Sequence, residues 1–312
     1  MVATTAAVRT ETRQQQIDRL IERHIRDRNM DPRSIEETYK FTHVGIELDP
    51  DFFEARLDMG WGFFKDQPRY LDHITRNMII FTYLAYRRST GCFHQGRKGV
   101  MMGATYEQMV EALEAAHTAG GGLTLHHGFE AILRMQKEGL VPGCQEGPWN
   151  GHWVQFDYRP GVVVDPMVEL PMPLSAEQLE DNIRRYYSAE LGASQIADDL
   201  IYASRIDPEF WSRYCRLAWG VYQAKPCFLD PIRRELMILG IYAFQGRTEL
   251  VEFHIRRALL MGAPVEALME AIEVTFVGSG NRILFDCTRI LRKVTGGAVL
   301  KGQVPVEKLK IA

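Results

Sequence analysis

Apolar residues recur at steps of three and four positions along most of this chain. Because this spacing places apolar side chains on one face of an α-helix, it predicts amphipathic helices, and the alternation typical of strands is rare. The sequence therefore predicts an all-α fold. The clearest helical segments are ITRNMIIFTYLAYR, YEQMVEALEAAHTAG, SAEQLEDNIRRYYSAE and RRELMILGIYAF.

Polar residues just before these segments support the assignment. Asp72 and Asp230 each precede a helical run as N-cap candidates, and Ser175, with Glu177 and Gln178 behind it, opens another. A side-chain oxygen at an N-cap accepts a hydrogen bond from a backbone N–H that has no partner within the helix. These residues therefore predict where three helices begin.

The helical pattern is interrupted between Glu138 and Pro173, where Gly and Pro are frequent. We expect this segment to be a linker or arm, with a short hairpin at HWVQFDYRPGVVV. Its large aromatic side chains predict that it packs on the helices or wraps a neighbouring subunit instead of forming a solvated tether. These side chains are Trp149, Trp153, Phe156 and Tyr158.

The chain also resembles itself at a separation of 158 residues, so that Asp72 matches Asp230. LDPDFFEARLDMGWGFFKDQPRYLDHITRNMIIFTYLAY aligns with IDPEFWSRYCRLAWGVYQAKPCFLDPIRRELMILGIYAF. Later segments align at 159, because the second copy gains one residue before His254. This internal repeat predicts a helical repeat at 1–137, the arm at 138–173 and a second helical repeat at 174–312.

Composition narrows the classes of function. The chain has 312 residues, 46% hydrophobic and 25% charged, which is enough to bury a large core. Its 37 basic and 40 acidic residues give a net charge of −3, so we expect neither a nucleic-acid partner nor a membrane surface. No segment approaches the roughly 18 to 20 apolar residues that cross a bilayer, and the N-terminus lacks an apolar signal core. We expect a cytoplasmic protein.

The cysteines indicate reduced thiols. Their number is odd, their spacing is wide, and no Cys-x-x-Cys occurs, which fits an intracellular chain better than a disulfide framework. The sequence also lacks a P-loop and a GxGxxG, and we expect no bound cofactor or metal. The cysteines are Cys92, Cys144, Cys215, Cys227 and Cys287.

A longer motif runs from Leu229 to Val274. An Arg-Glu pair opens an apolar helix, His-x3-Ala-x3-Gly-Ala follows, and an Ala- and Glu-rich helix comes next. This pattern resembles the carboxymuconolactone decarboxylase family, which shares its fold with the alkylhydroperoxidase D-like proteins. The 19 residues from Glu235 to His254 match the spacing of that superfamily, and the first repeat resembles it from Leu71 to Met135.

The resemblance implies an all-α fold of two tandem carboxymuconolactone-decarboxylase-like helical repeats that form a pseudo-dimer within one chain. Family members assemble from several copies, with sites in pockets between helices. Three chains of two repeats would reproduce a ring of six domains, so we expect a homo-oligomer and favour a trimer.

The chain departs from the family pattern in both repeats. Members that reduce peroxides carry Cys-x-x-Cys just before the histidine, and the second repeat holds Arg247 and Leu250 there. The first repeat holds Asn77 at the glutamate position and Gln95 at the histidine position. Dithiol chemistry is therefore excluded in the second repeat, and the acid–base pair of the first is lost or rebuilt.

Glu235 and His254 are the candidate catalytic pair. Decarboxylation of an acid activated by its own carbonyl or lactone needs a proton returned to carbon, and histidine, oriented by glutamate, is suited to that task near neutral pH. The sequence thus favours a metal-free lyase, a decarboxylase or related proton-transfer enzyme, acting on a small unsaturated oxygenated carboxylic acid or lactone. A purely structural alternative has Glu235 stabilising a helix N-terminus and His254 facing water.

The first repeat offers an alternative polar set. Its residues belong to different predicted helices, and either a rebuilt acid–base pocket or separately satisfied side chains would explain them; metal binding is disfavoured by their loose spacing. A thiol-dependent peroxidase centred on the cysteine and a non-catalytic ligand-binding scaffold remain alternative functions. The set is Cys92, His94, His117, His126 and His127.

Three further pairs of equivalent residues have architectural interpretations. Trp61 and Trp219, each followed by glycine, are predicted to pack in the core. Arg76 and Arg234 are predicted to form buried ion pairs with two equivalent glutamates, with substrate-carboxylate binding as the alternative. These glutamates are Glu111 and Glu270.

Overall fold

The computed structural model describes residues 11–27, 40–59, 69–142, 153–166, 168 and 172–309. Every regular element in these residues is helical, which confirms the predicted all-α fold. The chain divides into two compact units, residues 1–69 and 70–312. This division falls inside the predicted repeat at 1–137, because helices of both predicted repeats pack against each other in the second unit.

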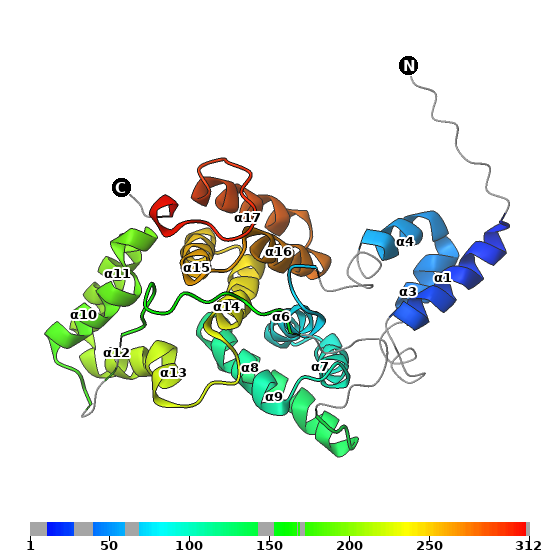
Figure 1. The fold of residues 1–312 in the computed structure, drawn as a ribbon. Coiled ribbons are helices and arrows are strands. Elements are labelled where there is room, and N and C mark those ends of the chain that lie inside the picture. Colours follow the sequence, from blue (N-terminus) through cyan, green and yellow to red (C-terminus); the bar gives the residue numbers. More distant parts are fainter. Residues whose placement is uncertain are drawn as a thin grey trace. The chain divides into compact units, whose positions relative to one another are not determined.

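Three helices build the described part of the first unit. Asp49 caps the last of them by accepting a hydrogen bond from the backbone N–H of Phe52, and Pro50 occupies its first turn. A small apolar core of Ile17, Leu20, Ile46 and Leu57 joins the three helices. Trp61 lies outside the described residues. The helices are α1 (Arg13–Asp27), α3 (Lys40–Leu48) and α4 (Pro50–Leu57) (Figure 1).

Two sets of four helices dominate the second unit. The first set is α6 (His73–Tyr86), α7 (Gly91–Met101), α8 (Tyr106–Gly120) and α9 (Gly122–Lys137). The second set is α14 (Pro231–Gln245), α15 (Thr248–Met261), α16 (Val265–Ser279) and α17 (Asn281–Val294). The first helices of the two sets begin 158 residues apart, and the third and fourth begin 159 apart.

Helix α14 lies in the middle of this unit and packs against α6, α8, α15 and α16 (Figure 1). The predicted caps position these helices. Asp72 accepts a hydrogen bond from Thr75 N at 2.6 Å, and Asp230 accepts one from Arg233 N at 3.0 Å. Ser175 forms a capping box with Gln178. The three N-cap predictions are confirmed.

Two ion pairs cross between the helix sets, one of them buried and the other partly buried. Arg76 Nη1 lies 3.3 Å from Glu270 Oε1, and Arg234 Nη1 lies 3.0 Å from Glu111 Oε1. Both carboxylates also accept backbone N–H groups, Glu270 from Leu71 and its neighbour and Glu111 from the residue before Leu229. Such partners are required because a buried charge without them is costly. The predicted ion pairing of these arginines is confirmed.

The remaining helices pack mainly against one another, and the 3-10 turn Ala189–Leu191 among them contacts α15. Trp219 is fully buried there and stacks on Tyr186 with ring centroids 4.4 Å apart, which confirms its predicted core position. A π-helical turn, Arg216–Gly220, carries this tryptophan, and two short 3-10 turns are Ala189–Leu191 and Val306–Lys308. The helices are α10 (Ala176–Tyr186), α11 (Ser194–Ile206), α12 (Pro208–Cys215) and α13 (Val221–Ala224).

The described part of the arm, residues 153–166, lies against the helices. It contains no strand, so the hairpin prediction is wrong there. The physical reason is that its backbone donates hydrogen bonds to neighbouring helices and their caps: Arg159 N donates to Met261 O at 2.8 Å, and Val154 N donates to Asp72 Oδ2 at 3.1 Å. The predicted packing of the arm is confirmed for these residues, and Trp149 lies outside them.

Gly262 permits the arm to approach the end of α15. Its φ is +105°, and a Cβ atom at this position would lie 2.4 Å from the carbonyl oxygen of Asp157. Gln303 Nε2 bridges the two segments by donating to the carbonyls of Asp157 and Gly262 at 2.7 and 2.8 Å. A side chain here would therefore displace the arm as well as strain the backbone.

Candidate functional site

Glu235 and His254 meet in the interior of the second unit. Glu235 lies near the start of α14, His254 lies in the middle of α15, and the two helices pack against each other. His254 Nδ1 is 2.6 Å from Glu235 Oε2, and each residue is only 4% exposed. The structure thus brings the two predicted residues into direct contact, and the alternative in which His254 faces water does not hold.

Arg257 completes the site from one turn further along α15. Its Nε donates to Glu235 Oε1 at 3.0 Å, so the two carboxylate oxygens of Glu235 bind the histidine and the arginine separately. Its Nη2 donates to Asp165 Oδ1 at 2.6 Å, which ties the arm to the site. Four side chains therefore form one chain of hydrogen bonds, which we call the Glu235 network: Asp165, Arg257, Glu235 and His254.

Aromatic rings enclose the Glu235 network. Tyr242 stacks on the His254 ring with centroids 5.3 Å apart, and Phe253 meets the same ring edge-on at 4.9 Å. The Arg257 guanidinium lies 4.4 Å from the centroid of the Tyr186 ring. Because these rings replace water around the charges, the electrostatic interactions inside the site are stronger than they would be at a surface.

Electrostatics fix the charge state of the carboxylate. Burial opposes ionisation of Glu235, but the charges of Arg257 and His254, and then their hydrogen bonds, outweigh it and lower the pKa of Glu235 to about 2. Burial also opposes the charge of Arg257, yet Asp165 and Glu235 raise its pKa well above the ordinary value. Glu235 is therefore a carboxylate, and Arg257 is a cation at neutral pH.

This arrangement can orient and exchange a proton. An ionised Glu235 accepts a hydrogen bond from the protonated Nδ1 of His254, which sets the tautomer of the neutral ring. The other ring nitrogen, Nε2, is then the atom available for taking up or releasing a proton. A carboxylate that orients a histidine in this way is a recurrent feature of general acid–base catalysis.

The equivalent positions of the first repeat carry no such pair. Asn77 on α6 donates a hydrogen bond to the backbone carbonyl of Gln95 on α7. Asn77 is 3% exposed and Gln95 is 6% exposed. Asn77 Oδ1 and Gln95 Oε1 have no hydrogen-bond partner among the residues that the structure describes. Two amides thus stand where the second repeat has a carboxylate and an imidazole, and amides do not titrate near neutral pH.

The alternative first-repeat residues have different surroundings. Cys92 is 1% exposed with Sγ 3.8 Å from Phe81 O, and burial raises the pKa of its thiol. His94 is buried against the Phe93 ring, whereas the His126 side chain is 75% exposed. A protonated, buried thiol is a poor nucleophile, so these observations disfavour thiol chemistry at Cys92.

The two remaining members of that set, His117 and His127, lie on different helices, α8 and α9. His127 is 3.2 Å from Ser89 O and 3.2 Å from Glu130 Oε2, so both of its ring nitrogens have partners. His117 lies in the last turn of α8 and is half-buried. Among the residues that the structure describes, no three His, Cys, Asp or Glu side chains form a group that could hold a metal ion.

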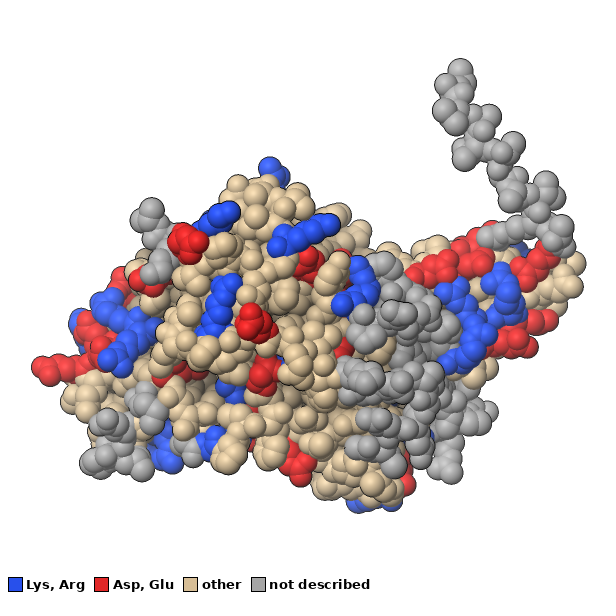
Figure 2. All heavy atoms as spheres, in the orientation of Figure 1, with Lys and Arg blue, Asp and Glu red and all other residues tan. Residues whose placement is uncertain are grey.

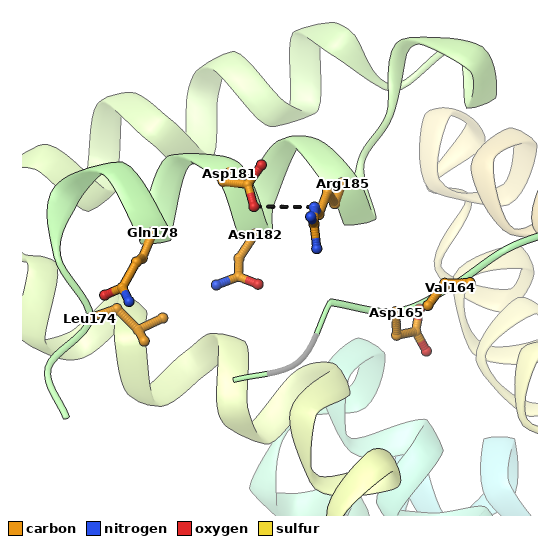
Figure 3. A pocket seen from close by; sticks show the side chains of 7 residues that line it. All are labelled: Val164, Asp165, Leu174, Gln178, Asp181, Asn182 and Arg185. Atoms are coloured by element: carbon orange, nitrogen blue, oxygen red, sulfur yellow. Dashed lines mark ion pairs between the residues drawn. The ribbon is translucent and has the colours of Figure 1, made fainter. Parts of the chain in front are cut away.

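A pocket of about 310 Å³ adjoins the Glu235 network. Figure 3 shows side chains of α10 along one side of it and Asp165 of the arm on the other. Asp165 therefore belongs both to the pocket wall and to the network through Arg257. The lining residues are Val164, Asp165, Leu174, Gln178, Asp181, Asn182 and Arg185.

Sequence analysis identified neither Arg257 nor Asp165. Arg257 carried a usable signal, because it follows His254 by three positions on a predicted helix and so shares its face. No sequence pattern indicated Asp165, because it lies in an irregular segment without hydrophobic periodicity. Its role follows only from the tertiary contact with Arg257.

Comparison with known proteins places the site in a recognised segment. Residues 208–292 match the family model described as "Carboxymuconolactone decarboxylase family", and this segment includes Glu235, His254 and Arg257. The match covers about a quarter of the chain. It supports a relationship to this superfamily and hence a decarboxylase-like or peroxidase-like function. The comparison with curated proteins gave no match.

Acidic and basic side chains are interspersed on the face shown in Figure 2, as expected for a net charge of −3. Among the described helices, none is long and apolar enough to cross a membrane.

Proposed function

We propose that the Glu235–His254 pair is the proton-transfer centre of a lyase that decarboxylates a small unsaturated, oxygenated carboxylic acid or lactone. One observation carries this proposal: the 2.6 Å contact between His254 Nδ1 and Glu235 Oε2 in a buried site. The alignment of residues 208–292 with the decarboxylase family supports the same chemistry.

Glu235 and Arg257 act as positioning residues. The carboxylate holds the Nδ1 proton and stabilises the imidazolium form of His254, and Arg257 keeps the carboxylate ionised. Because each carboxylate oxygen of Glu235 bonds a different partner, its side chain has little freedom to rotate. His254 is the residue that exchanges the proton with substrate, through Nε2.

The proposed step balances without an added cofactor. The bond between the substrate's α-carbon and its carboxylate breaks, CO₂ leaves, and the electron pair passes to the conjugated carbonyl or lactone of the substrate. The imidazolium of His254 then returns one proton to carbon, and solvent restores the proton to the ring. A dry site favours this reaction because the substrate carboxylate loses its stabilising water.

The direct test measures CO₂ released from a panel of unsaturated lactone carboxylates, carboxymuconolactone among them, with purified protein. We expect release of one CO₂ per product and incorporation of one deuterium at carbon in D₂O. Absence of CO₂ from every member of the panel, with correctly folded protein, would contradict the proposal.

We also infer that the chain arose by tandem duplication of one helical repeat. Equivalent contacts recur in both directions between the repeats: Arg87 Nη1 donates to Gly278 O at 3.0 Å, and Gln245 Nε2 donates to Ala119 O at 2.7 Å. Residues 87 and 245 are equivalent at the offset of 158, and 278 and 119 are equivalent at 159. Reciprocal contacts of this kind are typical of two copies related by a two-fold axis.

We further propose that the chain forms a homo-oligomer, and we favour a trimer. Light scattering at micromolar protein concentration tests it, and a monomer would contradict it.

A further inference from the structure

The pocket beside Asp165 has features of a ligand site that the proton-transfer proposal does not use. Its volume of about 310 Å³ is at the lower end of the range for small-molecule pockets. Four of its residues share one face of α10 at steps of three and four positions, and Leu174 and Val164 add apolar contacts. The pocket therefore combines apolar walls with a row of polar side chains.

The α10 side of the pocket presents hydrogen-bond donors. Asn182 is 7% exposed, and its amide, which carries two N–H donors, lines the pocket. Gln178 Oε1 accepts from Ser175 N in the capping box, which leaves its NH₂ group as a donor. Figure 3 shows both amides and the Arg185 side chain directed toward the same space.

Arg185 adds a positive charge and further N–H donors to the pocket. Its Nε lies 3.1 Å from Asp181 Oδ2, and this exposed ion pair engages one edge of the guanidinium. The two Nη groups remain for a second partner. Such a fork matches the geometry of a carboxylate, which it binds through two parallel hydrogen bonds.

The opposite side of the pocket presents an acceptor. Asp165 Oδ1 accepts from Arg257, and its side chain is 21% exposed, so the carboxylate remains accessible from the pocket. A ligand donor that bonds Asp165 would add a second partner to a carboxylate already fixed in place. Because Arg257 holds Asp165, this contact costs little ordering of the side chain.

We propose that this pocket binds a small carboxylate that also carries a hydroxyl or ammonium donor, with the carboxylate on Arg185, Asn182 and Gln178 and the donor on Asp165. The binding does not depend on the proposed lyase activity. It extends that proposal because an occupied pocket contacts Asp165, the outer member of the Glu235 network.

Calorimetric titration of the full chain tests this assignment with three probes: lactate, glycine and acetate. Lactate carries a hydroxyl, glycine carries an ammonium, and acetate carries neither. We expect lactate, glycine or both to bind at millimolar concentration and acetate to bind about tenfold more weakly, since one charge-assisted hydrogen bond is missing.

Matched variants on α10 locate the binding. Arg185→Gln removes the proposed carboxylate partner, and Arg184→Gln removes a neighbouring exposed arginine that pairs with Glu180 and Asp198 instead. We expect Arg185→Gln to weaken binding about tenfold or more and Arg184→Gln to leave it unchanged. Both residues are exposed, so both variants should fold.

Three outcomes would overturn the assignment. The first is no saturable binding of lactate or glycine. The second is equal weakening by the two arginine variants, which would indicate a general charge effect. The third is acetate binding as tightly as both other probes, which would remove the role of Asp165. Each outcome is independent of CO₂ release, so failure of this assignment and failure of the lyase proposal are distinguishable.

Discussion

The two sets of four helices carry different polar side chains at matching positions. In the second repeat, Glu235 and His254 form a buried hydrogen bond of 2.6 Å. In the first, Asn77 and Gln95 occupy the equivalent positions of α6 and α7. The ion pairs of Arg76 and its equivalent cross between the repeats in both directions.

This difference shows which residues the fold needs and which it can replace. The first repeat keeps the helix order and the cross-repeat contacts without an acid–base pair, so the fold does not depend on that pair. Within the described part of the chain, its Asn77 Oδ1 and Gln95 Oε1 have no hydrogen-bond partners, and each unsatisfied buried acceptor costs about 1 to 3 kcal/mol. In the second repeat, both carboxylate oxygens of Glu235 have partners, His254 and Arg257, and Arg257 also bonds Asp165. We therefore expect the activity to lie in the second repeat.

The largest expected effect is on turnover. His254→Gln should lower kcat by a factor of about 10² to 10⁴, because glutamine keeps a polar side chain of similar size but cannot exchange a proton near neutral pH. The variant places glutamine at the position that is equivalent to Gln95 in the first repeat. CO₂ release under substrate saturation measures the change.

The matched control is His127→Gln, which removes a histidine bonded to Ser89 O outside the site. We expect it to retain activity. If His254→Gln kept full activity and His127→Gln lost it, the active site would lie in the first repeat and not in the second.

The second effect is on stability. Arg257→Met should lower the free energy of unfolding by about 3 to 5 kcal/mol, because it leaves the carboxylates of Glu235 and Asp165 without their shared cation in a buried site. Urea denaturation measures the loss. Arg256→Met is the control and should cost less, since its partner Glu252 keeps Lys293 at 2.7 Å.

A result in which both arginine variants cost the same would contradict the special role of Arg257. It would show that the Glu235 network contributes no more to stability than the neighbouring pair of Arg256 and Glu252.

The third effect is a pH dependence. Glu235 has a folded pKa of about 2, below its ordinary value of 4.5, because Arg257 and His254 outweigh the opposing effect of burial. A lowered carboxyl pKa contributes stability that is fully present above 4.5 and is lost as the pH falls through 2. Wild type should therefore exceed Glu235→Gln in stability near neutral pH, and the difference should shrink as the pH falls from about 4.5 toward 2.

Denaturation of both proteins at several pH values in this window measures the difference. A difference that stays constant with pH would show that Glu235 stabilises the fold through packing and not through charge.

The sequence predicts the helices better than the site. Periodicity, the caps at Asp72 and Asp230 and the internal repeat predict helices at the right places, because local hydrogen bonds and burial of one face determine them. The Glu235–His254 contact is predictable only through family resemblance, since the residues lie on two different helices. Asp165 is not predictable, because an irregular segment gives no information about which helix it contacts.

The smallest expected effect is at Cys92. Cys92→Ala should change kcat less than about twofold and cost about 1 kcal/mol of stability, because it removes one buried sulfur from the core of the first repeat. Burial raises the pKa of this thiol, so it stays protonated at neutral pH and cannot act as a thiolate nucleophile. If the variant kept native stability but lost activity more than about tenfold, the first repeat would hold the reacting group. The thiol-dependent alternative would then replace the proposal built on His254.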